Sequence, residues 1–274
     1  MSPASRWSDL ERPPLNVAAL NRALVEGGLW REVRVVEETG STNADLADLA
    51  RAGEPEGLVL VAEHQTAGRG RLGRVWTAPA RSGLSFSMLL RPAAVPAAQW
   101  PLLPLLVGVG LANAVASTAE VDVALKWPND LMIGDAKLGG ILAERVESPT
   151  GAAAVVGVGL NVTLRATELP VPTAISLGLA GAAVTDRDTL LRASLRGVAR
   201  EYTRWVDRAG DPSSAILSSY RELCVTLGRE VRAELPGGRA VDGRAVDVDE
   251  VGSLIVETAG GREVVSAGDV THLR

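Results

Sequence analysis

A short stretch from Gly68 to Trp76 combines a permissive backbone with concentrated positive charge. Its sequence, Gly-Arg-Gly-Arg-Leu-Gly-Arg-Val-Trp, holds three glycines and three arginines. Glycine lets backbone N–H groups approach a ligand closely, and the guanidinium fork matches the oxygens of a phosphate or carboxylate. Trp76 adds a flat apolar face beside them. The stretch is typical of an anion-binding loop, and a solvated basic turn is the alternative interpretation.

Two other polar clusters stand at the ends of predicted elements. Lys126-Trp127-Pro128-Asn129-Asp130 gathers an ammonium, a carboxamide and a carboxylate around a proline, and Lys137 begins the next predicted strand. Upstream, Gly40-Ser41-Thr42-Asn43 precedes a predicted helix, where hydroxyls and N–H groups are presented together. An Asn-Asp turn with a structural tryptophan explains the first cluster equally well, and simple helix capping explains the second.

Together these residues favour electrostatic catalysis over several other mechanisms. A lone prominent carboxylate, Asp130, does not equip a two-carboxylate hydrolase. The two histidines, His64 and His272, lack a Ser or Cys partner pattern and cannot make a zinc site. The loop at Gly68 also lacks the ending of a Walker A motif. Clustered arginine and lysine suit a polyphosphate transition state, and five cations are available: Arg69, Arg71, Arg74, Lys126 and Lys137.

The overall composition is that of an ordinary soluble globular protein. The chain has 274 residues, of which 46% are hydrophobic and 22% charged, and its formal net charge is -5. A mildly acidic chain argues against a general nucleic-acid binder. The single cysteine, Cys224, excludes an intramolecular disulfide. Because no signal peptide or uninterrupted membrane span is evident, we expect a cytoplasmic protein without membrane contact.

Hydrophobic periodicity predicts an α/β region followed by a small β-rich one. Predicted helices cover residues 15–29, 44–52, 102–119, 188–209 and 216–223, and predicted strands cover 30–37, 58–63, 84–90, 121–125 and 155–162. Ser85 and Ser87 are expected on the surface of their strand. Beyond Val225, short β segments alternate with turns, which predicts an antiparallel barrel of roughly fifty residues without a catalytic cluster.

Five motifs resemble those of biotin protein ligases, in the same order and at similar spacing. They are Gly40-Ser41-Thr42-Asn43, Gln65-Thr66-Ala67-Gly68-Arg69-Gly70-Arg71, Lys126-Trp127-Pro128-Asn129-Asp130, Lys137-Leu138-Gly139-Gly140-Ile141-Leu142 and Gly157-Val158-Gly159-Leu160-Asn161. The resemblance implies an α+β fold, in which an α/β catalytic domain with a mixed sheet of the biotin/lipoate protein ligase type precedes a small SH3-like β-barrel. We therefore expect a tail and short helix at 1–32, a catalytic domain at 33–223 and the barrel at 224–274.

The resemblance also implies an activity, an ATP-dependent biotin–protein ligase, and a role for individual residues. The catalytic candidates are Lys137, Arg71, Asp130 and Lys126. The biotin-binding candidates are Ser41, Thr42, Asn43, Gln65, Gly68, Arg69, Arg71, Lys137, Gly140, Leu142, Gly157 and Leu160. The ATP-binding candidates are Arg69, Arg71, Arg74, Trp76, Asn129, Lys137 and Asn161. Trp127 is expected to pack in the core, and Mg2+ to arrive with ATP rather than at a metal site of the protein.

The implied partner is the biotin carboxyl carrier domain of a biotin-dependent carboxylase. Too few residues precede Val33 for a helix-turn-helix domain, so we expect no repressor activity, no nucleic-acid partner and a monomer or weak homodimer. One alternative is a regulator that binds biotin or its adenylate without transfer, against which Lys137 and Asp130 argue. A lipoate-type ligase is the other, and the motifs at 68–71 and 126–130 favour biotin over it.

Overall fold

A seven-stranded mixed sheet forms the centre of the molecule in the computed structural model, which describes residues 12–211 and 216–273. The strand order is β1-β2-β5-β9-β8-β7-β6, and the strands are β1 Glu32–Thr39, β2 Leu58–Gln65, β5 Gly83–Leu90, β6 Ala124–Lys126, β7 Asp130–Ile133, β8 Ala136–Val146 and β9 Ala153–Asn161. Only β1 and β2 run parallel among the paired strands of this sheet in the described residues. The predicted mixed sheet is confirmed.

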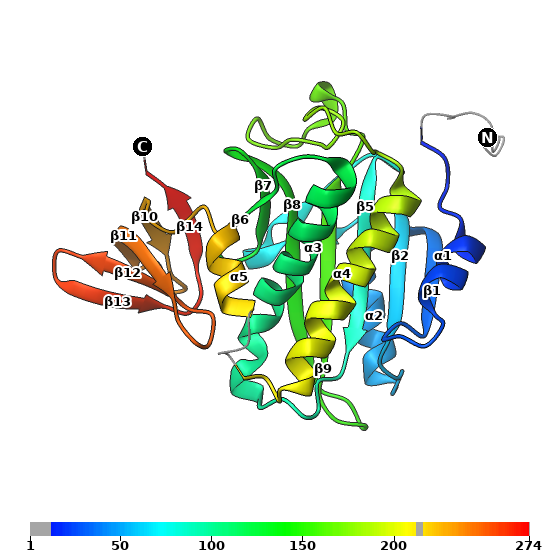
Figure 1. The fold of residues 1–274 in the computed structure, drawn as a ribbon, viewed down its shortest axis with the longest axis horizontal. Coiled ribbons are helices and arrows are strands. Elements are labelled where there is room, and N and C mark those ends of the chain that lie inside the picture. Colours follow the sequence, from blue (N-terminus) through cyan, green and yellow to red (C-terminus); the bar gives the residue numbers. More distant parts are fainter. Residues whose placement is uncertain (1–11, 212–215, 274) are drawn as a thin grey trace.

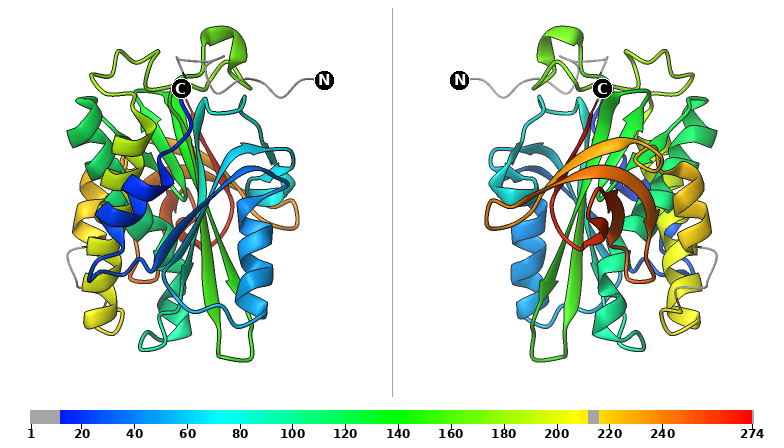
Figure 2. Two further views of the ribbon diagram at one scale, coloured as in Figure 1. Left: turned by 90° about the vertical axis from the view of Figure 1, so that its right-hand side faces the viewer. Right: turned by 90° about the vertical axis from the view of Figure 1, so that its left-hand side faces the viewer.

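Helices cover both faces of this sheet. Figure 2 shows α2 on one face and α1, α3 and α4 on the other. The helices are α1 Val17–Leu24, α2 Thr42–Arg51, α3 Leu103–Ala119, α4 Arg187–Asp207 and α5 Ile216–Leu223. The first helix is shorter than its predicted span of 15–29 and ends next to Val25, before the glycine pair at 27 and 28. Because both faces of the sheet are covered, strand residues can be buried on either side.

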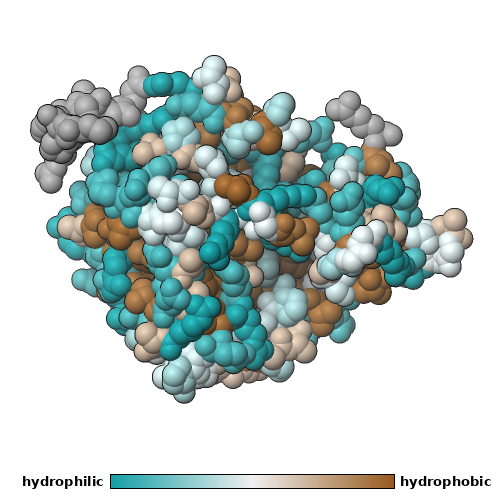
Figure 3. Space-filling model, turned by 180° about the vertical axis from the view of Figure 1, so that it is seen from behind, coloured by the Kyte–Doolittle hydropathy of each residue, from teal (hydrophilic) through white to brown (hydrophobic). Residues whose placement is uncertain are grey.

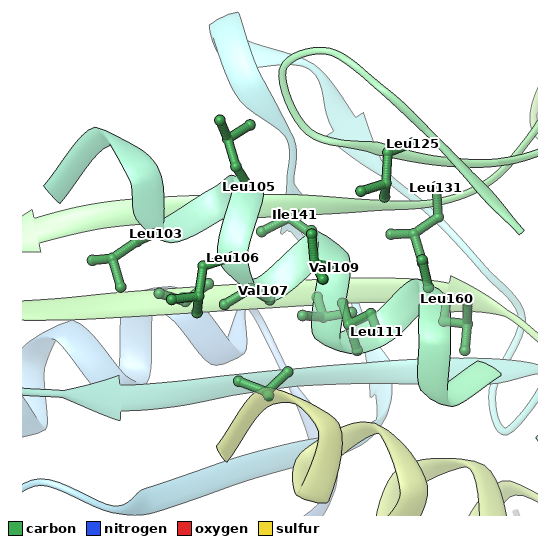
Figure 4. Packing of buried hydrophobic residues seen from close by; sticks show 14 of the residues in the cluster. Leu103, Leu105, Leu106, Val107, Val109, Leu111, Leu125, Leu131, Ile141 and Leu160 are labelled. Atoms are coloured by element: carbon green, nitrogen blue, oxygen red, sulfur yellow. The ribbon is translucent and has the colours of Figure 1, made fainter. Parts of the chain in front are cut away.

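The apolar helix α3 lies beside α4 on one face of the sheet, and most of its residues are buried (Figure 1). Figure 4 shows Val107 and Val109 of α3 close to Ile141 of β8, within one buried hydrophobic cluster. Gly110 meets Gly197 of α4 so closely that an added Cβ would lie 2.9 Å from the facing backbone. The stretch Ala97–Ala119 has the length and apolar composition of a membrane span, but 72% of its apolar window is buried in the fold. We therefore interpret it as a core helix.

The C-terminal part is a five-stranded antiparallel sheet that lies beyond β6 (Figure 1). Its order is β13-β12-β11-β10-β14, with β10 Glu230–Glu234, β11 Ala240–Val248, β12 Leu254–Thr258, β13 Gly261–Val265 and β14 Asp269–His272. The predicted small antiparallel domain is confirmed, although β14 lies outside the predicted strands. Trp127 joins the two parts, because its buried indole Nε1 donates to the carbonyl of Gly252 at 2.9 Å. Its predicted packing in the core is also confirmed.

Candidate active site

A cavity of about 130 Å³ opens on the α2 face of the sheet and brings several of the predicted motifs together. Its outer rim is a short hairpin, β3 Gly68–Arg69 and β4 Val75–Trp76, joined by a turn at residues 70–74. The other walls come from the N-terminus of α2, from β7 to β9, and from the start of β14. Figure 3 shows the face that carries α2, where apolar residues form only small patches among hydrophilic ones.

Neutral hydrogen bonds build the wall at the N-terminus of α2. Ser41 occupies the N-cap position, but its side chain makes no capping bond. Instead, Gln65 Oε1 accepts from the backbone N–H of Thr42 at 2.8 Å and from its hydroxyl at 3.1 Å. Ser87 lies 2.7 Å from the Thr42 hydroxyl and donates to Asn43 Oδ1 at 2.6 Å. The capping alternative for Ser41 is therefore wrong, and its hydroxyl is left to line the cavity.

Ser87 is completely buried, so the expectation that it lies on the strand surface is wrong. The reason is that α2 covers the face of β5 that a two-layer arrangement would leave in solvent. Asn43 is also held on its other side, where Nδ2 donates to Glu144 Oε2 at 2.7 Å. Thr42 and Asn43 thus have fixed orientations before any ligand binds.

The two glycines inside β9 make room for side chains that enter the cavity. A Cβ at Gly157 would lie 2.1 Å from Asn43 Oδ1, and a Cβ at Gly159 would lie 2.3 Å from the indole of Trp76. The Trp76 ring therefore rests directly on the strand backbone. Its buried indole Nε1 has no hydrogen-bond partner among the described residues, which leaves a donor for a bound molecule.

The charged wall centres on one ion pair. Lys137 Nζ lies 2.7 Å from Asp130 Oδ1, and both side chains line the cavity while remaining partly exposed, at 35% and 20%. Asn129 sits beside them, where its Nδ2 donates to the carbonyl of Ile141 at 2.8 Å. Gly140 adjoins the pair, since an added Cβ there would be in van der Waals contact with Lys137 Nζ, at 3.4 Å.

The arginines of the hairpin turn contact the C-terminal domain. Arg71 Nη1 donates to the carbonyl of Gly268 at 3.3 Å and to Asn129 Oδ1 at 3.4 Å. Burial lowers the pKa of Arg71 from its usual range, and Asp130 opposes that shift. Arg74 donates to Asp269 Oδ1 at 3.3 Å, and this hydrogen bond raises the pKa of Arg74. Both groups stay cationic, so they remain able to bind an anion.

Most of the predicted site residues line this one cavity. They are Ser41, Thr42, Asn43, Gln65, Arg69, Arg71, Arg74, Trp76, Asn129, Asp130, Lys137, Gly140, Leu142 and Gly157. Four others, Gly68, Lys126, Leu160 and Asn161, do not line it.

Each of these four has a structural reason for its position. Gly68 pairs with Trp76 in the hairpin, so close that an added Cβ would lie 2.4 Å from the Trp76 carbonyl. Leu160 is 2% exposed and belongs to the hydrophobic core. Lys126 is the β6 partner of Asp130, and its charge helps to lower the pKa of His272 in the C-terminal domain. Asn161 Nδ2 donates to the carbonyl of Ile175 at 3.0 Å.

The sequence reasoning missed the contribution of the C-terminal domain. Gly268 and Asp269 line the cavity, so the C-terminal domain, for which we expected no catalytic cluster, forms part of the wall of the site. The exposed side chains of Leu72 and Val75 also line the cavity. They were not among the predicted site residues, although they lie within the stretch from Gly68 to Trp76. A carboxylate that meets Arg74 across 195 residues leaves no local pattern in the sequence.

The carboxylates of the cavity are engaged with cations. Asp130 faces Lys137 and Asp269 faces Arg74. Across residues 12–211 and 216–273, no group of three or more His, Cys, Asp or Glu side chains has the arrangement to hold a metal ion. The donor set therefore fits an anionic organic ligand better than a resident cation.

Comparisons with known proteins agree with this geometry. Residues 35–161 match the biotin/lipoate A/B protein ligase family, and residues 226–273 match the biotin protein ligase C-terminal domain. The chain is 44% identical to the biotin–[acetyl-CoA-carboxylase] ligase of Mycobacterium tuberculosis, over 97% of this chain and 98% of that protein. It is 34% identical to the bifunctional ligase/repressor BirA of Escherichia coli, over 90% of this chain and 76% of BirA.

Solved structures give the same result. The biotin protein ligase from Aquifex aeolicus, in complex with biotin and ATP, matches with a TM-score of 0.75 and 28% identity. The match covers 89% of this chain and 100% of that one. Similarity of sequence along nearly the whole chain, together with the same fold and the shared motifs around one cavity, has one explanation: the chain belongs to the biotin protein ligase family of enzymes.

Proposed function

We propose that this chain activates biotin as biotinyl-5′-AMP at the expense of ATP and then transfers biotin to a lysine of a biotin carboxyl carrier domain. The observation that carries the proposal is the shared cavity, in which the Lys137–Asp130 ion pair lies together with Arg69, Arg71 and Arg74. The M. tuberculosis relative is named for ligation of biotin to acetyl-CoA-carboxylase, and the A. aeolicus structure contains biotin and ATP. Both support the same reaction.

The first half-reaction joins two anions. A carboxylate oxygen of biotin attacks the α-phosphorus of ATP, the bond between the α-phosphorus and its bridging oxygen breaks, and pyrophosphate leaves. Lys137 exchanges its contact with Asp130 for oxygens of the biotin carboxylate and the α-phosphate. Arg69 and Arg71 add positive charge from the hairpin side of the cavity. Catalysis then consists mainly of charge placement, because the fixed cations stabilise negative charge that accumulates in the transition state.

The two walls of the cavity suit the two substrates. Neutral donors and acceptors around α2, with Asn43 seated over Gly157, match the uncharged ring system of biotin. Arg74 is available to the ATP phosphates, and the Trp76 ring offers a stacking surface for adenine. Mg2+ enters with the ATP phosphates, since the carboxylates at the cavity are already paired.

The second half-reaction forms an amide. The amine of the carrier lysine attacks the carbonyl carbon of the mixed anhydride, the carbon–oxygen bond to phosphate breaks, and AMP leaves with the electron pair. The incoming ammonium must first lose a proton, and Asp130 is the carboxylate of the cavity nearest to Lys137. We assign it to orient the acceptor amine and take up that proton. The carrier domain and a cytoplasmic location are parts of this proposal.

Intact-mass measurement of a carrier domain tests the whole proposal. The full chain is incubated with biotin, MgATP and a biotin carboxyl carrier domain, and the expected product is the carrier with one added biotinyl group. Omission of ATP and a carrier whose acceptor lysine is changed to arginine are the controls. A carrier that stays unmodified, while the M. tuberculosis relative modifies it under the same conditions, would overturn the proposal. Formation of biotinyl-AMP without transfer would identify a regulatory binder instead, and modification by lipoate would identify a lipoate-type ligase.

A further inference from the structure

Residues 173–175, which do not line the cavity, hold the backbone of Lys137. The N–H of Lys137 donates to the carbonyl of Thr173 at 2.7 Å, and its carbonyl accepts from the N–H of Ile175 at 2.9 Å. Residues 173–175 thus run parallel to the start of β8, with Ala174 as the bridge partner of Lys137. The backbone N–H and C=O of Lys137 are thus both hydrogen-bonded to this segment.

This contact lies where the regular sheet stops. The β8–β9 pairing begins at Gly139 and Leu160, so Lys137 lies beyond the end of β9. On its other side, the register shifts between Leu131 and Met132, which leaves Leu138 as an extra residue in β8. A bulge of this kind bends a strand and redirects the neighbouring side chain. Lys137 therefore has no partner in β9, and residues 173–175 take the place of that strand beside it.

Asn161 holds that segment in place. It is the last residue of β9 and 2% exposed. Its Nδ2 donates to the carbonyl of Ile175 at 3.0 Å, and its own carbonyl accepts from the N–H of Leu177 at 3.1 Å. Ser176, also fully buried, donates from its hydroxyl to the carbonyl of Leu164 at 2.7 Å. The segment is therefore anchored at Ile175 and at the two residues that follow it, directly after its contact with Lys137.

We propose that Asn161 is a positioning residue for Lys137, acting through residues 173–177. The proposal rests on the assigned role of Lys137 in adenylate formation. The path has two hydrogen-bonded steps, from the Asn161 carboxamide to the Ile175 carbonyl and from the Ile175 N–H to the Lys137 carbonyl. The bond from the Lys137 N–H to Thr173 ties Lys137 to the same segment a second time. Loss of the carboxamide leaves the Ile175 carbonyl without its donor, and the segment loosens at the point where it fixes Lys137. The resemblance to biotin protein ligases implied only contact with ATP for this residue.

Two variants separate this role from a contact with the nucleobase. Asn161→Ala removes the anchor. Ile175→Pro removes the N–H that donates to Lys137, places the proline ring against the Lys137 carbonyl and leaves Asn161 intact. We expect kcat for biotinyl-AMP formation to fall about 10- to 100-fold in both, because a displacement of about 1 Å can cost a rate of this size. KM for ATP should change little in Ile175→Pro. Ile175→Val is the control, because it keeps the N–H donor, and it should have the wild-type rate.

Amide hydrogen exchange provides a readout that does not need activity. In the ligand-free protein, the Lys137 amide should exchange faster in Asn161→Ala and in Ile175→Pro than in the wild type. Asn21→Ala is the matched control, since the Asn21 carboxamide also ties two elements through backbone bonds to Val33, away from the cavity. It should leave both exchange at Lys137 and kcat unchanged.

The outcomes distinguish the two proposals. Unchanged exchange at Lys137 in Asn161→Ala, or a wild-type kcat in Ile175→Pro, would overturn the positioning role. A wild-type protein that makes no biotinyl-AMP would instead refute the proposed function, and the exchange measurement would still decide whether Asn161 holds Lys137.

Discussion

The two walls of the cavity are built in opposite ways. At the N-terminus of α2, neutral side chains are buried and satisfied by short hydrogen bonds, such as that from Ser87 to Asn43 at 2.6 Å. Across the cavity, the polar groups are charged, partly exposed and joined as ion pairs, with the Lys137 side chain at 35% exposure and that of Arg74 at 61%. One wall is integrated into the core, and the other meets solvent.

This difference has an energetic consequence. A buried neutral network contributes to folding, because removing one member leaves a polar atom without a partner. A solvent-exposed ion pair contributes little to stability, because water and salt screen it. The neutral wall can therefore hold a fixed shape, while the charged wall can exchange its internal partners for an anionic substrate at small cost. The following substitutions test that contrast, from the largest expected effect to the smallest.

Substitution of Lys137 should separate activity from stability most strongly. Lys137→Met removes the ammonium and keeps a flexible chain of similar length. We expect adenylate formation to fall by about 10²- to 10³-fold, the range seen when one preorganised electrostatic group is lost. The free energy of unfolding should change by less than about 1 kcal/mol, because the lost ion pair is partly exposed.

Single-turnover formation of biotinyl-AMP and urea unfolding measure the two quantities for Lys137→Met. Lys126→Met is the matched control, since Lys126 does not line the cavity. Equal losses of rate in the two variants would contradict the assignment of Lys137, and a large loss of stability in Lys137→Met would contradict the contrast between the walls.

Ser87→Ala should give the opposite result on the neutral wall. The substitution removes the donor to Asn43 Oδ1 inside a fully buried site, so we expect a loss of about 1–3 kcal/mol of folding free energy. Affinity for biotin should also decrease, since Asn43 and Thr42 lose a common neighbour. Urea unfolding and calorimetric titration with biotin test both effects. Ser85→Ala, on the same strand but partly exposed, is the control and should be close to neutral.

The sequence predicts local groupings well and distant ones poorly. Asp130 and Lys137 lie on one hairpin, so their spacing along the chain already brings them together. The burial of Ser87 depends on α2, which packs against β5 from a separate part of the chain. The placement of Asn161 depends on the later segment at 173–177, which shows no strand pattern of its own. Such positions follow from tertiary packing rather than from periodicity.

The C-terminal domain illustrates the same limit. Its short strands and turns are readable as an antiparallel unit, because alternation and glycine turns are local signals. Its contribution to the cavity through Asp269 is not, since β14 is short and Asp269 meets Arg74 of the hairpin from 195 residues away in the sequence. The motifs at Gly68 and Lys137 therefore predict the kind of chemistry, but not every residue that surrounds it.

A pH-dependent loss of stability is expected at the interface between the two domains. Burial, followed by the charges of Lys126 and Arg229, lowers the pKa of His272 from 6.5 to about 4. The folded state thus binds this proton less readily than the unfolded chain, so the stabilising effect is complete above pH 6.5 and is lost as the pH falls toward 4. Urea unfolding between pH 7.5 and about 4 measures the slope.

His272→Gln tests whether that slope belongs to His272. Glutamine does not titrate, so the variant should show a flatter dependence of the unfolding midpoint between pH 6.5 and about 4. His64→Gln serves as the control because His64 lies outside the interface and pairs with Glu38 at 2.9 Å. An unchanged slope in His272→Gln would assign the effect to other groups.

Asp269→Asn should have the smallest effect on folding. It removes the charge that holds Arg74 across the domain interface, but the Arg74 side chain is 61% exposed and that of Asp269 is 33% exposed. We expect the free energy of unfolding to change by about 0–1 kcal/mol, and less at high salt. The matched control is Asp242→Asn, which breaks the exposed pair with Arg232 elsewhere in the C-terminal domain. A loss well above that of the control would mean that the charged wall, like the neutral one, is part of the folded framework, and that Arg74 is fixed by Asp269 rather than free to move to a phosphate.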